Sequence, residues 1–151
     1  MKEYRITKIK EYMFDIIKEL TEDETFKVNA NYLSNKIGDY SLDKMPIDPE
    51  VDEWILDTSE NRDVFSFRSR KGYSPRIIDN LTNIGFFEML EQKIKSNNRE
   101  GVLPEIKGIQ SIKCLSCGTF LSNDDGNSAI FDITIEVTYV DFIKEETILS
   151  L

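Results

Sequence analysis

The sequence of 151 residues contains no histidine and only two cysteines. The absence of histidine excludes every catalytic triad or dyad that relies on an imidazole, and with it most catalytic zinc sites. Two cysteines are too few for a framework of several disulfides. No apolar run approaches the ~20 residues of a membrane span, and no apolar signal segment precedes the first amphipathic stretch. We therefore expect a soluble domain made inside the cell, without a cofactor.

Positive charge is also scarce, because 19 Lys and Arg residues stand against 28 Asp and Glu residues, for a net charge of −9. Such a chain is a poor general nucleic-acid binder, since affinity for phosphates comes from clustered Lys and Arg. A content of 40% hydrophobic and 31% charged residues is typical of a folded protein. The length predicts one domain, residues 1–140, followed by a tail, residues 141–151, whose apolar residues are available for a partner.

Two segments have the apolar spacing of helices. From Ile6 to Leu20, apolar residues recur every three or four positions and form one stripe. Ser74 and Pro75 are typical of a helix start, as N-cap and first helical residue. The apolar phase of this second helix changes after Gly85, which predicts a kink or a break there, and Gly101 closes it.

In other segments apolar and polar residues alternate, which is typical of β-strands. We expect strands at 26–32 and 64–71, and a C-terminal β-hairpin of 109–120 and 129–139 joined by a turn-rich loop. Residues 35–61 show no clear period and predict a long, partly extended loop with one short helix or strand near Trp54. The element order predicts an α+β fold, a small antiparallel or mixed β-sheet with helices packed on one face.

Cys114 and Cys117 have the spacing of half a zinc site, because two thiolates two residues apart can share a tetrahedral metal. Four ligands are needed, and the chain has no second cysteine pair, so a metal would have to be shared between subunits. On a strand, residues three apart point to opposite faces and do not chelate together. A zinc or redox role is therefore the weakest of the functional hypotheses.

No other motif indicates an enzyme. Ser41 and Lys44 match the Ser-x-x-Lys pattern of penicillin-recognising enzymes, but its companion motifs are absent. The acids at 123–126 lack the alternate spacing and the following bidentate Glu of a calcium loop. We expect no catalytic residue in this chain.

The charges are strongly segregated along the sequence. Residues 39–60 carry eight acids and one base, and residues 62–76 carry five bases and one acid. One interpretation is intramolecular, with the acidic loop folded back on the basic strand. A second is a head-to-tail interface between subunits. Its candidate residues are Asp48, Glu50, Asp52, Glu53, Asp57, Glu60, Arg68, Arg70 and Lys71. A third is a platform of Phe65, Phe67, Arg68 and Arg70 that stacks single-stranded nucleic acid, although the rings and the guanidinium groups fall on opposite faces.

Several runs resemble a family of small tail and minor capsid proteins of bacteriophages and prophages, over about residues 38–140. The runs are Gly38-Asp39-Tyr40-Ser41-Leu42-Asp43-Lys44-Met45-Pro46, Asp63-Val64-Phe65-Ser66-Phe67, Asn80-Leu81-Thr82-Asn83-Ile84-Gly85-Phe86-Phe87-Glu88, Leu103-Pro104, Phe131-Asp132-Ile133 and Val137-Thr138-Tyr139. These are packing and turn patterns, not catalytic signatures.

The resemblance implies a tail terminator or tail completion protein with a small α+β fold and no active site. Such proteins cap the tail tube as a ring, commonly a hexamer, and present a surface to the neck or connector. The implied partners are further copies of the chain, the tube protein, and sheath and neck proteins, with DNA passing through the ring. The implied location is the tail of a virion or of a contractile tail-like particle, assembled in the bacterial cytoplasm. The alternative is a small nucleic-acid-binding or regulatory module of a mobile element.

Overall fold

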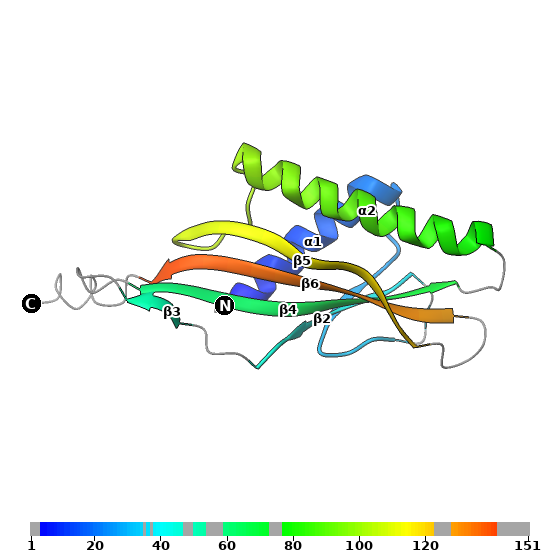
Figure 1. Ribbon diagram of the computed structural model, residues 1–151, viewed down its shortest axis with the longest axis horizontal. Coiled ribbons are helices and arrows are strands. Elements are labelled where there is room, and N and C mark those ends of the chain that lie inside the picture. The colour runs from blue at the N-terminus through cyan, green and yellow to red at the C-terminus, as the bar shows by residue number, and fades with distance from the viewer. Residues whose placement is uncertain are drawn as a thin grey trace, which may run out of the picture.

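The structure, a computed structural model, describes residues 4–34, 36, 38–46, 50–53, 59–72, 77–122 and 128–141, and these residues form two helices and six strands (Figure 1). In chain order the elements are α1 (Arg5–Thr21), β1 (Val28–Ala30), β2 (Tyr40–Lys44), β3 (Glu50–Glu53), β4 (Ser59–Gly72), α2 (Ile77–Glu100), β5 (Ile109–Ser122) and β6 (Ser128–Asp141). The predicted α+β class, with an N-terminal helix and a C-terminal hairpin, is confirmed.

The strands form one mixed sheet in the order β1-β2-β4-β6-β5. Of the described pairs only β1 and β2 are parallel, and β3 pairs with the first residues of β4 beyond the end of β2. The centre of the sheet is the long pair β4–β6, which runs antiparallel from Ser59↔Asp141 to Gly72↔Ser128. In Figure 1, α2 runs along the margin of the sheet beside β5, and α1 lies behind the strands.

Alternation along the central strands determines which face is buried. On β6 the residues from Ala129 to Tyr139 that share one parity are all buried, and on β4 Phe65 and Phe67 lie on the same face. Successive side chains of a strand point to opposite faces, so this face collects the apolar set and the other keeps the polar one. Both helices contribute to the core on the apolar face, which confirms that the helices pack on one side of the sheet.

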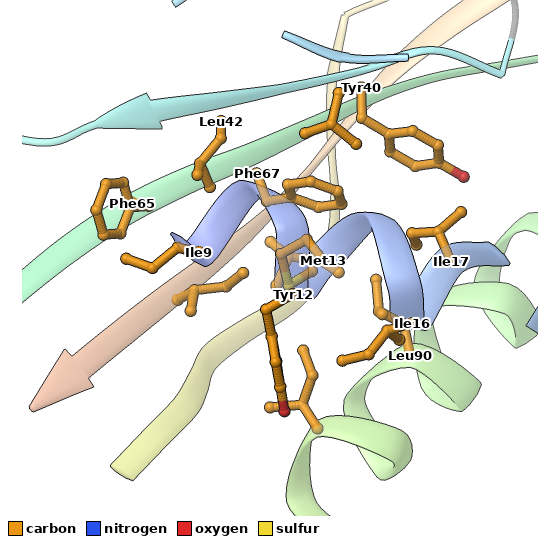
Figure 2. Close-up of a cluster of buried hydrophobic side chains, with 14 of the residues drawn as sticks. Ile9, Tyr12, Met13, Ile16, Ile17, Tyr40, Leu42, Phe65, Phe67 and Leu90 are labelled. Carbon is orange, nitrogen blue, oxygen red and sulfur yellow. The ribbon is translucent and has the colours of Figure 1, made fainter. Parts of the chain in front are cut away.

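Helix α1 supplies the predicted apolar stripe. Ile9, Met13, Ile16 and Ile17 are buried, and Figure 2 shows Ile9 and Met13 near Leu42, Phe65 and Phe67 of the sheet. Ile16 lies near Leu90 of α2. Glu22 adopts a left-handed conformation and its N–H donates to the carbonyl of Lys18, which ends the helix.

Helix α2 is continuous across Gly85, so the predicted break there is wrong. The structure does not describe the expected cap, Ser74-Pro75, or the side chains of the first residues of this helix. The buried residues after Gly85 are Phe87, Leu90, Ile94 and Asn97, spaced by three or four. They therefore make one stripe on an unbroken helix. Gly101, with φ +75°, ends it as predicted.

Two strand predictions need correction. The strand expected at 26–32 is only three residues long, because Asn31 takes a left-handed φ of 55° and ends the pairing. The segment 35–61, expected to be mainly a loop, contains β2, β3 and the start of β4. Its missing alternation arises because β2 is buried on both faces at Tyr40, Ser41 and Leu42. Trp54, where a short element was expected, lies outside the described residues.

An ion pair with a buried carboxylate joins α1 to the sheet. Asp63 on β4 is 2% exposed, and its Oδ2 accepts a hydrogen bond of 2.8 Å from Nε of Arg5, the first residue of α1. The ammonium of Lys44 lies 3.6 Å from the other oxygen of the carboxylate. The Arg5 guanidinium also sits 4.4 Å from the centre of the Tyr139 ring. Among the described helices, none is long and apolar enough to span a membrane.

We predict that Arg5→Met lowers the free energy of unfolding by about 2 kcal/mol, because it leaves the buried Asp63 carboxylate with Lys44 alone. Lys10→Met, at an exposed position of the same helix, is the matched control and should change stability by less than ~0.5 kcal/mol. Urea unfolding followed by circular dichroism measures both. Equal stabilities of the two variants would contradict the role given to this pair.

Candidate functional site

The acidic strand β3 lies far from the basic end of β4. Glu50 pairs with Asn61 and Glu53 with Ser59, whereas Arg68–Lys71 lie seven or more residues further along β4. At ~3.3 Å per residue this separation is at least about 23 Å along the strand. The backbone of β3 is thus not adjacent to Arg68–Lys71, and the side chains of β3 lie outside the described set. The intramolecular interpretation holds for Asp43, which belongs to the same acidic segment and pairs with Arg68. Asp48 and Asp57 lie outside the described residues.

The three cations of the predicted interface are each used within the chain. Arg68 donates to Asp43 from the outer face of the sheet, the face that the helices leave uncovered. Arg70, on the same face, is only 4% exposed, and its Nε donates to the carbonyl of Ser34 over 2.9 Å. Arg70 thus joins the loop before β2 to β4, Arg68 joins β2 to β4, and both leave little charge for a partner.

Lys71 lies on the opposite face from Arg68 and Arg70. Its ammonium donates to the hydroxyl of Tyr40 over 2.8 Å and sits 3.8 Å from the centre of the Phe86 ring. Burial among these rings lowers the pKa of Lys71 to about 8, because the charged form loses its hydration. Lys71 is thus part of the core lining, and the three cations do not form one patch.

The nucleic-acid platform predicted on β4 is wrong. Phe65 and Phe67 are 1% and 0% exposed, and they pack under α1. Rings that are buried in the core cannot stack on bases.

The described structure supplies no metal site around the cysteine pair. Cys114 lies on β5 opposite Ile135, and the side chain of Cys117 lies outside the described set. Among the described residues no three Cys, Asp or Glu side chains come together as ligands. The part of the chain that is described thus brings no third ligand to Cys114.

A groove of about 430 Å³ lies between α1 and α2. We call it the acidic groove, since its walls carry five acids and two bases: Glu11, Asp15, Glu19, Glu100 and Glu105 against Lys8 and Lys93. Lys93 pairs with Glu19 over 2.9 Å, and Lys8 lies 3.8–3.9 Å from Glu11 and Glu105. Asp15 and Glu100 make no ion pair within the described chain, so the groove keeps a negative excess.

Hydrogen bonds connect residues that line the acidic groove. Nδ2 of the buried Asn97 donates to the hydroxyl of Tyr12 over 3.3 Å, and that hydroxyl donates to the carbonyl of Val102 over 3.2 Å. Figure 2 shows Tyr12 pointing from α1 toward α2. Burial raises the pKa of Tyr12, and the hydrogen bond from Asn97 opposes this in part. The chain of contacts ties both helices to the segment after α2.

A second groove, of about 370 Å³, lies on the other side of α2, against β5. We call it the basic groove, because Lys95, Arg99 and Lys113 line it with a single acid, Glu91. Lys95, Arg99 and Lys113 form no ion pair with the described residues. Its inner wall is apolar, formed by Ile94 and Ile112 together with Cys114.

The helical repeat separates the two grooves. Lys93, Asn97 and Glu100 line the acidic groove at spacings of four and three, and so share one side of α2. Glu91, Lys95 and Asn98 line the basic groove with the same spacing, offset by two residues. An offset of two residues is roughly 200° around a helix, so the grooves lie on opposite sides of α2.

Neither groove is evident in the sequence, because their charges come from segments far apart in the chain. Lys113 joins Lys95 and Arg99 only through the packing of β5 against α2, and Glu11 and Asp15 meet Glu100 only across the helix pair. Counting charges along the sequence found β3 and β4, whose charges lie in one segment. The four-residue spacing of Lys95 and Arg99 on a predicted helix was the one signal within reach.

We predict that the free energy of unfolding rises with pH between about pH 8 and 10, and that Lys71→Met removes this rise. The unfolded chain keeps the Lys71 proton up to its ordinary pKa of 10.5, whereas the folded protein releases it near pH 8. Within this window the unfolded state binds more protons, and stability increases by at most ~1.4 kcal/mol per pH unit. Urea unfolding at pH 7.5, 8.5 and 9.5 measures the slope, with the exposed Lys27→Met as control. A rise unchanged in Lys71→Met would contradict the burial of this charge.

A scan against models of known protein families and a search of curated proteins returned no match to this chain.

Proposed function

We propose that this chain is a structural assembly protein of a bacteriophage tail or tail-like particle, a terminator or completion protein that forms a ring on the tail tube. The observation that carries the proposal is the pair of oppositely charged grooves on the two sides of α2. The resemblance of residues 38–140 to small tail and minor capsid proteins supports the same assignment.

Two complementary surfaces on opposite sides of one element favour head-to-tail contacts. A contact that joins two different surfaces repeats from copy to copy, and it forms a closed ring when the rotation between copies divides a full turn. In this arrangement Lys95 and Arg99 of one subunit face Asp15 and Glu100 of the next. These four side chains make no ion pair inside the described chain, so they can pair with a neighbouring subunit without breaking internal ion pairs.

The remaining charges suit a ring around a DNA passage. The net charge of −9 keeps most of the surface negative, and a negative wall repels phosphates and lets DNA slide past. The expected partners are other copies of the chain, with six as the expected number, then the tube protein and the neck or sheath proteins. The expected location is the head-proximal end of the tail.

Charge-swapped variants test the head-to-tail contact. Variant one is Lys95→Glu/Arg99→Glu and variant two is Asp15→Lys/Glu100→Lys. Each variant alone should fail to assemble on tail tubes or with itself, because one of its two surfaces repels its partner. A mixture should recover assembly, since the intact basic groove of variant two meets the intact acidic groove of variant one, and the reversed surfaces also match. Sedimentation velocity at 50 mM and 500 mM NaCl and electron microscopy of tubes measure the outcome.

The matched control is Lys10→Glu/Lys27→Glu, which makes the same change of net charge as variant one at exposed positions outside both grooves. It should assemble as the natural chain does. If variants one and two assemble normally, or if their mixture stays as inactive as each alone, the two grooves are not the contact. A protein that stays monomeric in the presence of tail tubes would contradict the ring itself.

A further inference from the structure

The two helices that border the acidic groove run in opposite directions along it. Lys93 of α2 pairs with Glu19 of α1 over 2.9 Å. Four residues further along α2, Asn97 contacts Tyr12, which lies seven residues before Glu19 in α1. The groove therefore follows both helices, and residues of α1 and α2 face each other across it in reverse order.

Two acids of the groove flank the contact between Asn97 and Tyr12. Asp15 lies three residues after Tyr12, and Glu100 lies three residues after Asn97. Because the helices are antiparallel, these acids lie on opposite sides of the contact, about 9 Å apart along the groove at ~1.5 Å of rise per residue. Neither acid makes an ion pair with the described residues. The groove thus presents two spaced negative charges to a ligand.

The hydrogen bonds of Tyr12 determine which atom of Asn97 faces a ligand. A tyrosine hydroxyl has a single proton, and Tyr12 donates it to the carbonyl of Val102 over 3.2 Å. The hydroxyl must therefore accept from Asn97, which places Nδ2 of Asn97 against Tyr12. Oδ1 of Asn97 accepts no hydrogen bond from the described residues, although Asn97 is only 6% exposed and lines the groove. A buried acceptor without a donor favours a ligand that carries N–H groups.

Apolar side chains also line the acidic groove: Ile16, Val102, Leu103 and Pro104. Such a lining packs against aliphatic carbon atoms, as it does against the stems of lysine side chains. A metal ion fits less well, because no three acidic side chains of the described residues come together as ligands. Spaced positive charges, N–H donors and aliphatic links between them are together the chemistry of a linear polyamine.

We infer that the acidic groove binds a linear aliphatic polyamine, with ammonium groups at Asp15 and Glu100 and an N–H directed at Oδ1 of Asn97. Its methylene groups pack on the apolar lining, and its ammonium groups make charge-assisted hydrogen bonds to the two carboxylates. Binding needs one chain only. In the ring proposed above the same two acids face the neighbouring subunit, so a bound polyamine competes with assembly; this consequence alone rests on the proposed function.

An NMR titration of the ¹⁵N-labelled chain with the triamine spermidine, at pH 7 and 50 mM NaCl, tests the binding. We expect one spermidine per chain and a shift of the side-chain amide of Asn97. An analogue with the same carbon chain and only quaternary nitrogens keeps the charge but has no N–H, and it should bind at least tenfold more weakly. Asp15→Asn/Glu100→Gln should weaken spermidine binding at least tenfold. The control Glu22→Gln/Glu88→Gln, which removes two exposed acids outside the groove, should change it less than twofold.

Lys95→Gln/Arg99→Gln separates this binding from the ring, because it removes the basic side of the proposed subunit contact and leaves the acidic groove intact. It should bind spermidine within twofold of the natural chain, whether or not the natural chain assembles. Equal binding of spermidine and its quaternary analogue would overturn the inference and assign the attraction to the negative surface as a whole. So would equal binding by the groove variant and its control, or a titration that leaves the amide of Asn97 unshifted.

Discussion

The alternation of apolar and polar residues along β4 and β6 is the constraint on which the rest of the structure depends. It gives the sheet a single apolar face, and both helices must pack there to bury their own apolar stripes. Two helices on one face of a sheet leave two seams, one between the helices and one between α2 and the edge strand β5. The acidic groove lies along the first seam and the basic groove along the second. Their charges come from the polar residues that border the buried apolar stripes of the helices.

The outer face of the sheet carries polar side chains that pair with one another across the strands. Arg62 pairs with Glu136 over 3.3 Å, Arg68 pairs with Asp43, and Ser66 donates to Asp132. Cross-strand neighbours of opposite charge stabilise such a face and leave little net field. The two grooves differ because their key charges have no partner across the seam within the described chain. An interaction surface is therefore more readily placed beside α2 than on the open sheet.

Local patterns in the sequence are sufficient for the parts of the fold that depend on one strong period. Helix α1 and the hairpin of β5 and β6 fall in this class, since each buries one stripe or one face. The sequence of residues 40–44 does not predict a strand, because it lacks an alternation of apolar and polar residues that matches burial. Ser41 is polar yet buried, and it forms hydrogen bonds with Tyr32 and Asp43. The break expected at Gly85 does not occur because burial of Phe87, Leu90 and Ile94 outweighs one glycine. The grooves escape prediction because they exist only after packing.

Charge counted along a sequence and charge presented by a surface are different quantities. The acidic strand β3 and the cations Arg68, Arg70 and Lys71 lie toward opposite ends of β4, and these three cations are engaged internally. The proposed contact instead uses Lys95 and Arg99 of α2 against Asp15 and Glu100 of the next subunit, which no count along the sequence brings together. The measurement that tests this account most directly is an electron-microscopy reconstruction of the protein assembled on a tail tube. The account predicts a closed ring in which the basic groove of each subunit faces the acidic groove of the next. A ring with both sides of α2 open to solvent would contradict it.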